Sequence, residues 1–355
     1  MKQTILHEEH IKQNAHMVEF ASWHMPLYYS SIIEEHKHVR AHVGIFDVSH
    51  MGKILILGRD ARAFWQKIQT YDIESVKTLQ CKYSFFLNEN GKIMDDTITT
   101  RIDDDLFFIP NAATTQKILK HLGKYSSGFD VKIIDLTEKL VCIALQGPEY
   151  KEILRKVINE KTATLKRFTG QFVTITDIQT CLPCLSSHDT ENFPYFSDSI
   201  LVTATGYTGE PGIEIIAKNE YGLLLWKAIL DDTKVIPIGL GARDTLRLEM
   251  GYLLSGTDFN EDRTPYETGY NWCVKLNHDF IGKSALVNSQ PSEIFTGVVL
   301  DNKMIPRHGT VIYKNDIPVG TVTSGTLSPM LNRGIGLGYI KKEFVKENEN
   351  ISTLI

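Results

Sequence analysis

The chain of 355 residues is longer than one average hydrophobic core supports, which predicts two or three domains. At 42% hydrophobic and 23% charged residues, with no apolar run near the roughly 18 residues of a bilayer span, it gives no membrane signal. A formal net charge of -5 argues against a mainly electrostatic nucleic-acid binder. The N-terminal residues lack the apolar core of a signal peptide, so a cytoplasmic location is expected.

The N-terminal part of the chain predicts an irregular succession of helices and strands. Ser31 and Glu34 have the spacing of a capping box, and helical periodicity continues until Gly44, which predicts a helix over residues 31–43. Apolar periodicity and turn signals then predict helices at 61–68 and 113–125 and strands at 46–48, 53–57, 82–87, 93–102, 105–110 and 131–134. This order is typical of an antiparallel α+β layer rather than of a doubly wound sheet.

The chain changes character near Phe295. Before this residue, the same patterns predict helices at 150–157, 221–230 and 242–250 and strands at 140–146, 200–204 and 213–216. After it, glycine, proline and asparagine separate short strands at 295–300, 310–313, 320–323 and 336–340. Such spacing is typical of a small β-barrel or jelly-roll module. The charged residues 341–350 that follow are expected to be solvated.

Two groups of metal-ligating residue types stand out. Cys181 and Cys184 form a CxxC, and His188 follows closely enough to make a partial ligand set. No second CxxC exists, which favours chance or loop packing over a zinc or redox site. His38 and His42 lie one helical turn apart and either chelate a metal or belong to a solvated helix face. We favour the solvated face and predict no metal site.

Two adjacent acids, Asp95 and Asp96, lie inside the predicted strand 93–102. Neighbouring residues of a strand point to opposite faces, so only one of the two can face a given pocket. A buried carboxylate is costly unless a ligand or a cation pairs with it. Each acid is therefore either a surface residue near a turn or a functional group that polarises a substrate amine.

Three glycines surround Tyr207 in the segment 206–212, which allows the backbone to approach a planar ligand closely. Glu214 follows between apolar neighbours, and its two acceptor oxygens match paired donors such as a pterin ring N–H and its 2-amino group. The alternative is a tight turn followed by an outward-pointing Glu214 on an edge strand.

The segment 239–244 has two of the glycines of a dinucleotide-binding loop but lacks the third, which excludes that motif. Its glycines open a predicted helix, and Arg243 in the first turn has the geometry to hold a carboxylate through a forked, charge-assisted bond. Pairing of Arg243 with Asp244 or Glu249, which would only stabilise the helix, is the alternative.

Nine blocks of the chain, taken together and in order, resemble the aminomethyltransferase, or T-protein, family of the glycine cleavage system. The blocks are residues 17–30, 44–52, 88–96, 111–113, 144–148, 206–214, 239–249, 264–269 and 323–329. Each block alone is a weak signal, whereas nine in the family's order form a specific one that covers almost the whole chain.

The resemblance implies an α+β fold, a three-domain cloverleaf around a central folate channel. The first implied domain, residues 1–50 with 140–245, is the folate-binding α+β domain. Residues 51–139 with 246–280 would form a ferredoxin-like antiparallel α+β domain. Residues 281–355 would form a C-terminal β-barrel or jelly-roll domain, expected to be short at its end.

The resemblance also implies an activity. The aminomethyl group would arrive on the lipoyl arm of H-protein, and its transfer to tetrahydrofolate would yield 5,10-methylenetetrahydrofolate, ammonia and dihydrolipoyl H-protein. By position, Asp96 would be the catalytic acid beside the folate N5 and N10 region. Glu214 would bind the pterin edge, and Arg243 would belong to the folate-binding set. The residues that would line the slot are Met51, Tyr83, Asn111 and Tyr207.

Departures from the family pattern keep two other functions open. Lys92 stands where a glycine is usual, and Phe168 stands where tyrosine is frequent. The segment between Phe168 and Gly206 is longer than expected. One alternative is a folate-binding relative without transferase activity, although the Lys-Gly-Cys-aromatic stretch of iron–sulfur maturation relatives is absent from the sequence. The other alternative is a folate-dependent demethylase.

Overall fold

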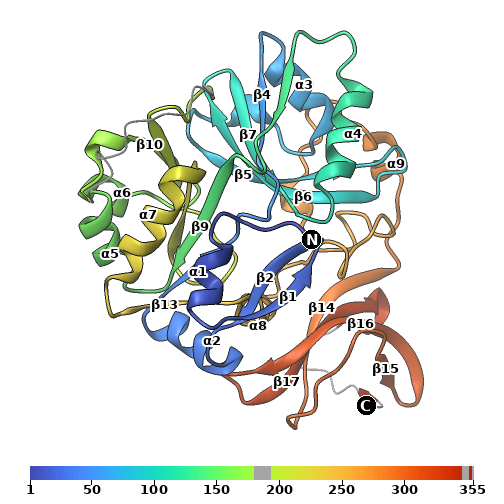
Figure 1. The fold of residues 1–355 in the computed structure, drawn as a ribbon. Helices are drawn as coiled ribbons and strands as arrows, with labels where there is room; N and C mark the ends of the chain where they lie inside the picture. The colour runs from blue at the N-terminus through green and yellow to red at the C-terminus, as the bar shows by residue number, and fades with distance from the viewer. Residues whose placement is uncertain (180–192, 346–351, 354–355) are drawn as a thin grey trace.

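The computed structural model describes residues 1–179, 193–345 and 352–353. Its named strands form three large sheets, of six, five and five strands, and one two-stranded hairpin. The three large sheets are arranged around the centre of the molecule, and the hairpin lies near that centre (Figure 1). This mixture of helices and mainly antiparallel strands confirms the predicted α+β class.

The six-stranded sheet has the strand order β10-β11-β12-β9-β3-β13, and β13 pairs in parallel with β3 while all other pairs are antiparallel. Its strands are β3 (Val43–Asp47), β9 (Leu140–Gln146), β10 (Gly170–Thr174), β11 (Ser199–Thr203), β12 (Gly212–Lys218) and β13 (Val235–Pro237). Helices α5 (Tyr150–Val157), α6 (Glu160–Ala163) and α7 (Asn219–Leu230) belong to the same part of the chain.

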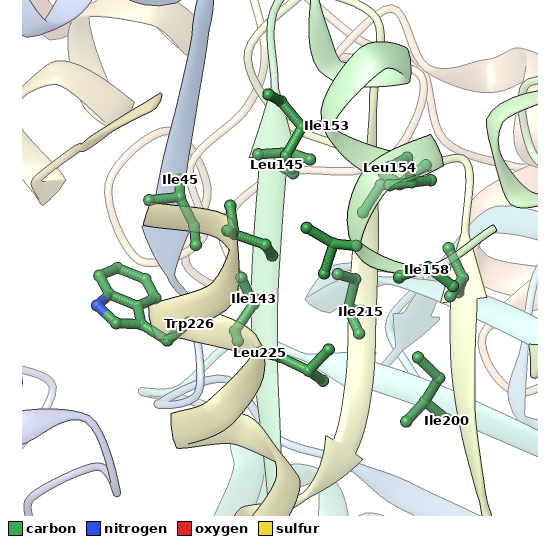
Figure 2. Close-up of a cluster of buried hydrophobic side chains, with 14 of the residues drawn as sticks. Ile45, Ile143, Leu145, Ile153, Leu154, Ile158, Ile200, Ile215, Leu225 and Trp226 are labelled. Carbon is green, nitrogen blue, oxygen red and sulfur yellow. The ribbon is translucent and has the colours of Figure 1, made fainter. Parts of the chain in front are cut away.

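One face of this sheet forms a large aliphatic core with α5 and α7. Ile143 and Leu145 on β9 belong to one cluster with Ile215 on β12 and with Leu225 and Trp226 on α7, and the Trp226 ring lies on the side of Ile45 (Figure 2). These side chains alternate along their strands, because every second residue of a strand points to the same face. The opposite face of the sheet is therefore free to pack against the rest of the molecule.

The second sheet has the strand order β5-β6-β7-β4-β8, antiparallel throughout. Its strands are β4 (Ile54–Leu57), β5 (Cys81–Leu87), β6 (Ile93–Ile102), β7 (Asp105–Pro110) and β8 (Lys132–Asp135). Helices α3 (Ala61–Ile68) and α4 (Thr115–Tyr125) cover one face, where Trp65 and Leu122 pack against Phe86 and Phe108. A shared cluster that includes Phe46 of the first sheet and Phe107 of the second joins the two sheets.

The third sheet, in the C-terminal part, has the strand order β14-β17-β16-β15-β18. Its strands are β14 (Glu293–Val299), β15 (Val311–Lys314), β16 (Ile317–Ser328), β17 (Arg333–Lys341) and β18 (Ser352–Thr353). Among the described residues its two outer strands, β14 and β18, do not pair with each other, so the sheet is open in this strand order. The short helix α9 (Lys283–Val287) precedes it.

Several N-terminal elements lie between these sheets. They are α1 (His7–Lys12), the hairpin β1 (His16–Phe20) and β2 (Trp23–Tyr28), and α2 (Ile32–Ala41). Helix α8 (Leu240–Glu249) contacts α2, β2 and the C-terminal strands β16 and β17, so it connects the N-terminal elements to the third sheet.

The predicted helices and strands agree with the structure where the apolar periodicity is strong. Several short elements, which carry little periodicity, were not predicted. The bounds of α3, α5, β6, β7 and β9 are those predicted from the sequence. The hairpin β1–β2, helix α1 and strands β10 and β13 were not predicted. The predicted helix 31–43 ends earlier, at Ala41, because Val43 already pairs with Val235 at the start of β3.

Candidate functional site

All seven predicted site residues line one cavity of about 970 Å³. They are Met51, Tyr83, Asp96, Asn111, Tyr207, Glu214 and Arg243. The cavity walls come from the hairpin β1–β2, the first two sheets, helix α8 and the C-terminal segment around Thr323. Residues from distant parts of the sequence thus meet around one volume, which is within the size range of small-molecule sites.

Strand alternation explains how two acids from different sheets reach the same cavity. Asp96 lies six residues before Ile102 on β6, an even spacing that places both on one face. Glu214 lies two residues before Ile216 on β12, again on one face. Because Ile102 and Ile216 belong to the shared cluster between the sheets, Asp96 and Glu214 both point toward the space where the sheets meet.

The prediction that only one of the two adjacent acids faces the pocket agrees with the structure. Asp96 lines the cavity, whereas Asp95 is fully buried behind it. The Asn111 side-chain amide bridges the pair, donating to Asp95 Oδ1 at 2.8 Å and to Asp96 Oδ1 at 2.6 Å. Asp95 also accepts from the Ser255 hydroxyl at 2.8 Å, and Asp96 accepts from the Tyr83 hydroxyl at 2.8 Å.

These surroundings raise the pKa of Asp96. Burial is the main cause and the charge of neighbouring Asp95 is the second, and together they raise the pKa of Asp96 to about 7 despite the bonds from Tyr83 and Asn111. Burial also raises the pKa of Asp95. A cavity carboxyl with a pKa near neutral pH can both hold and release a proton, as general acid–base chemistry requires.

Glu214 does not lie on an edge strand, so that alternative interpretation of the sequence is wrong. Strand β12 lies between β11 and β9, and Glu214 is opposite Thr203 on one side and Ala144 on the other. The Thr205 hydroxyl donates to Glu214 Oε2. No hydrogen bond to another described residue engages Glu214 Oε1, which leaves acceptor capacity on a residue of the cavity wall.

The glycine-rich segment 206–212 holds Tyr207 in the cavity wall. The Tyr207 hydroxyl donates to the Leu253 carbonyl, and its ring stacks on Tyr252 with centroids 5.8 Å apart. A Cβ on Gly206 would lie 2.0 Å from Gln146 Oε1, so a larger residue here would require the Gln146 amide to move. The backbone therefore passes directly over the buried Gln146 amide.

Arg243 has none of the ion pairs that the sequence offered as alternatives. Asp244 pairs with Arg247 at 2.8 Å, and Glu249 pairs with Arg40 at 2.9 Å. Arg243 instead lies over the Tyr207 ring, 4.8 Å from its centroid, and forms no ion pair with any described residue. A cation in a cavity wall without a carboxylate partner suits an anionic ligand group.

Sequence reasoning missed several cavity residues. Tyr270 and Trp272 add two aromatic rings beside Tyr83, and the Trp272 ring is 5.8 Å from the Tyr83 ring in a stacked arrangement. His50 also lines the cavity. The one available signal was the aromatic spacing in Tyr270-Asn271-Trp272, directly after a matched block. Rings of this kind provide flat apolar surface for a conjugated ligand.

The metal-ligating residue types give no cluster. Cys181, Cys184 and His188 lie outside the described residues. Within residues 1–179, 193–345 and 352–353, no group of three or more His, Cys, Asp or Glu side chains could hold a metal ion. His38 and His42 lie with ring centroids 5.0 Å apart, and His38 bonds to the Lys234 carbonyl at 2.8 Å. In the same ranges, no helix has the length and apolar character that crossing a membrane needs.

Comparisons with known proteins agree over nearly the whole chain. The family model described as GCVT N-terminal domain matches residues 6–278, and the one described as glycine cleavage T-protein C-terminal barrel domain matches residues 295–354. An aminomethyltransferase of Thermosipho melanesiensis is 37% identical over 349 residues, covering 97% of this chain and 90% of the relative. One of Chlorobium luteolum is 38% identical over 360 residues, covering 99% and 93%.

A solved structure gives the same result. The crystal structure of glycine cleavage system aminomethyltransferase T from Bartonella henselae superposes with a TM-score of 0.87 at 32% sequence identity. The match covers 100% of this chain and 94% of that chain. The similarity therefore includes the arrangement of all three large sheets and not only one of them.

Proposed function

Because the chain belongs to the glycine cleavage T-protein family, we propose that its cavity binds tetrahydrofolate as the acceptor of an aminomethyl group carried by the lipoyl arm of H-protein. The chain is an aminomethyltransferase of the glycine cleavage system, since two family models and full-length relatives agree on this activity. Transfer would yield 5,10-methylenetetrahydrofolate, ammonia and dihydrolipoyl H-protein.

The observation that supports folate most strongly is the convergence of Asp96, Glu214 and Arg243 on one cavity. A reduced pterin offers adjacent ring N–H and amino donors at its edge, and Glu214 has acceptor capacity toward the cavity. The acidic tail of a folate needs a cation, and Arg243 has no ion pair among the described residues. Aromatic side chains of the wall, Tyr207 and Trp272 among them, suit a conjugated ligand.

Asp96 would carry the acid–base part of the reaction. Tetrahydrofolate supplies the nucleophilic nitrogen that accepts the one-carbon unit. As a carboxylate, Asp96 would stabilise positive charge near that nitrogen, and with a pKa of about 7 it would also take up or return the proton released there. Tyr83 and Asn111 would hold the carboxyl group in place, because both donate hydrogen bonds to it.

Two measurements on the whole chain test this proposal. Tetrahydrofolate binding is measured for the unmodified chain and for Asp96→Ala, and ammonia release is then measured with aminomethylated H-protein as donor. We expect the unmodified chain to bind folate and release ammonia, and Asp96→Ala to release little ammonia. Folate binding without ammonia release from the unmodified chain would instead support a folate-binding relative or a folate-dependent demethylase.

A further inference from the structure

His50 lies in the cavity wall with unused hydrogen-bonding capacity. The residue is 2% exposed, and its Nδ1 atom is buried without a hydrogen-bond partner among the described residues. Its ring lines the cavity and meets the Phe20 ring edge-on, with centroids 5.6 Å apart. Buried polar side chains nearly always have a partner, since an unsatisfied one costs about 1–3 kcal/mol.

Burial keeps the His50 ring neutral. Burial is the main cause that lowers the pKa of His50, the negative charge of Asp47 opposes it, and the positive charges of Arg243 and Lys53 reinforce it, so that the pKa falls to about 3. At neutral pH the ring therefore offers one N–H donor and one bare nitrogen acceptor. It adds polarity beside Arg243 without adding a second positive charge.

A buried lysine fixes the turn that carries His50. Lys53 is 0% exposed, and its ammonium group donates to the carbonyl of Ser49 at 2.6 Å and to that of Met51 at 2.8 Å. The Ser49 amide also donates to Asp47 Oδ1 at 2.9 Å. The backbone is therefore held on both sides of His50. Burying an ammonium group is costly, and here its bonds restrain the one turn that presents His50 and Met51 to the cavity.

We propose that His50 donates or accepts a hydrogen bond with bound tetrahydrofolate, at a polar atom of the ligand that lies beside Arg243. This inference rests on the proposed function, because it takes folate as the occupant of the cavity. The ring lines the cavity and forms no hydrogen bond with a described protein group, so a bond to the ligand would replace none within the protein. Lys53 is then a positioning residue, since it touches the turn and not the ligand.

The test compares two phenylalanine variants of the whole chain. His50→Phe removes the polar ring atoms and keeps an aromatic ring. His121→Phe is the matched control, because His121 is also buried with an unpartnered ring nitrogen, Nε2, but lies on α4 away from the cavity lining. Tetrahydrofolate affinity is measured by isothermal titration, and Tm is measured without ligand to show that each variant is folded.

We expect His50→Phe to weaken tetrahydrofolate binding about fivefold to tenfold, as the loss of one hydrogen bond predicts, and His121→Phe to leave it unchanged. Equal affinity of His50→Phe and the unmodified chain would overturn the inference, and so would an equal loss in His121→Phe. If the unmodified chain binds no tetrahydrofolate, the proposed function itself fails. Should a phenylalanine variant not fold, leucine at the same positions is compared by the same criteria.

Discussion

Replacing Asp96 with asparagine should remove activity and at the same time stabilise the protein at alkaline pH. In the folded protein, burial and the neighbouring Asp95 raise the pKa of Asp96 from 3.8 to about 7. Ionised Asp96 is therefore an unfavourable group in the fold, whereas asparagine carries no charge. A group that lowers the stability of the fold is common where the residue serves catalysis.

The sign and size of the effect follow from this pKa. Below about pH 4 the acid is protonated in the folded and unfolded states alike, so it costs nothing there. As the pH rises from about 4 to 7, the unfolded chain loses the proton first, and the folded state becomes less stable by at most about 4 kcal/mol. Solvent in the cavity reaches Asp96, and asparagine keeps only part of the bonding to Tyr83 and Asn111, so we expect Asp96→Asn to gain about 2 kcal/mol at pH 8.

The assay is thermal unfolding of both proteins, without folate, at pH 5 and at pH 8. The Tm of Asp96→Asn should exceed that of the unmodified chain by roughly 2–8 °C at pH 8, and the difference should shrink strongly at pH 5. Ammonia release from aminomethylated H-protein should fall about 10²- to 10⁴-fold, as for loss of a general acid or base. A lower Tm for Asp96→Asn by the same amount at both pH values would refute the reasoning.

Three further substitutions probe the cavity wall. Arg243→Leu should weaken tetrahydrofolate binding at least tenfold in a titration, because a charged hydrogen bond contributes about 1.5–3 kcal/mol, and unchanged affinity would count against the proposed role. Gly206→Ala should also weaken tetrahydrofolate binding at least tenfold, because its Cβ would lie 2.0 Å from Gln146 Oε1. An alanine variant with normal affinity would show that this contact relaxes freely. Arg40→Met should lower the urea midpoint of unfolding, because Glu249 loses its arginine partner, and the free energy of unfolding should fall by about 3 kcal/mol. An unchanged midpoint would contradict this.

The local pattern of residues was sufficient to predict most helices and strands and to assign each strand residue to one face of its sheet. The ten residues Ile93–Ile102 form one strand as predicted, and their alternation correctly separates Asp95 from Asp96. The sequence patterns missed the hairpin β1–β2, whose residues are mixed in polarity and carry no strong alternation. The family resemblance, which rests on the nine matched blocks, is confirmed by the two family models, which match residues 6–278 and 295–354.

The partners of charged side chains were not decided by local spacing. Arg243 could have paired with Asp244 or Glu249 by helical spacing, but these acids pair with Arg247 and Arg40 instead. Arg40 comes from α2, far away in sequence, and also binds Glu210 at 2.9 Å. An ion pair depends on which elements pack together, and that depends on contacts between distant segments.

The amino-acid sequence by itself determined the periodicities, the special glycines and the face of each strand on which an acid would lie, because these are properties of neighbouring residues. Only the tertiary structure decided that Asp96 and Glu214 share a cavity, that β12 is an internal strand and that His50 Nδ1 is buried without a hydrogen-bond partner in the described part of the chain. The physical reason is that the pairing order of strands and the packing of one sheet on another are set by long-range burial of apolar surface, and the spacing of residues along the chain does not encode which distant faces will meet.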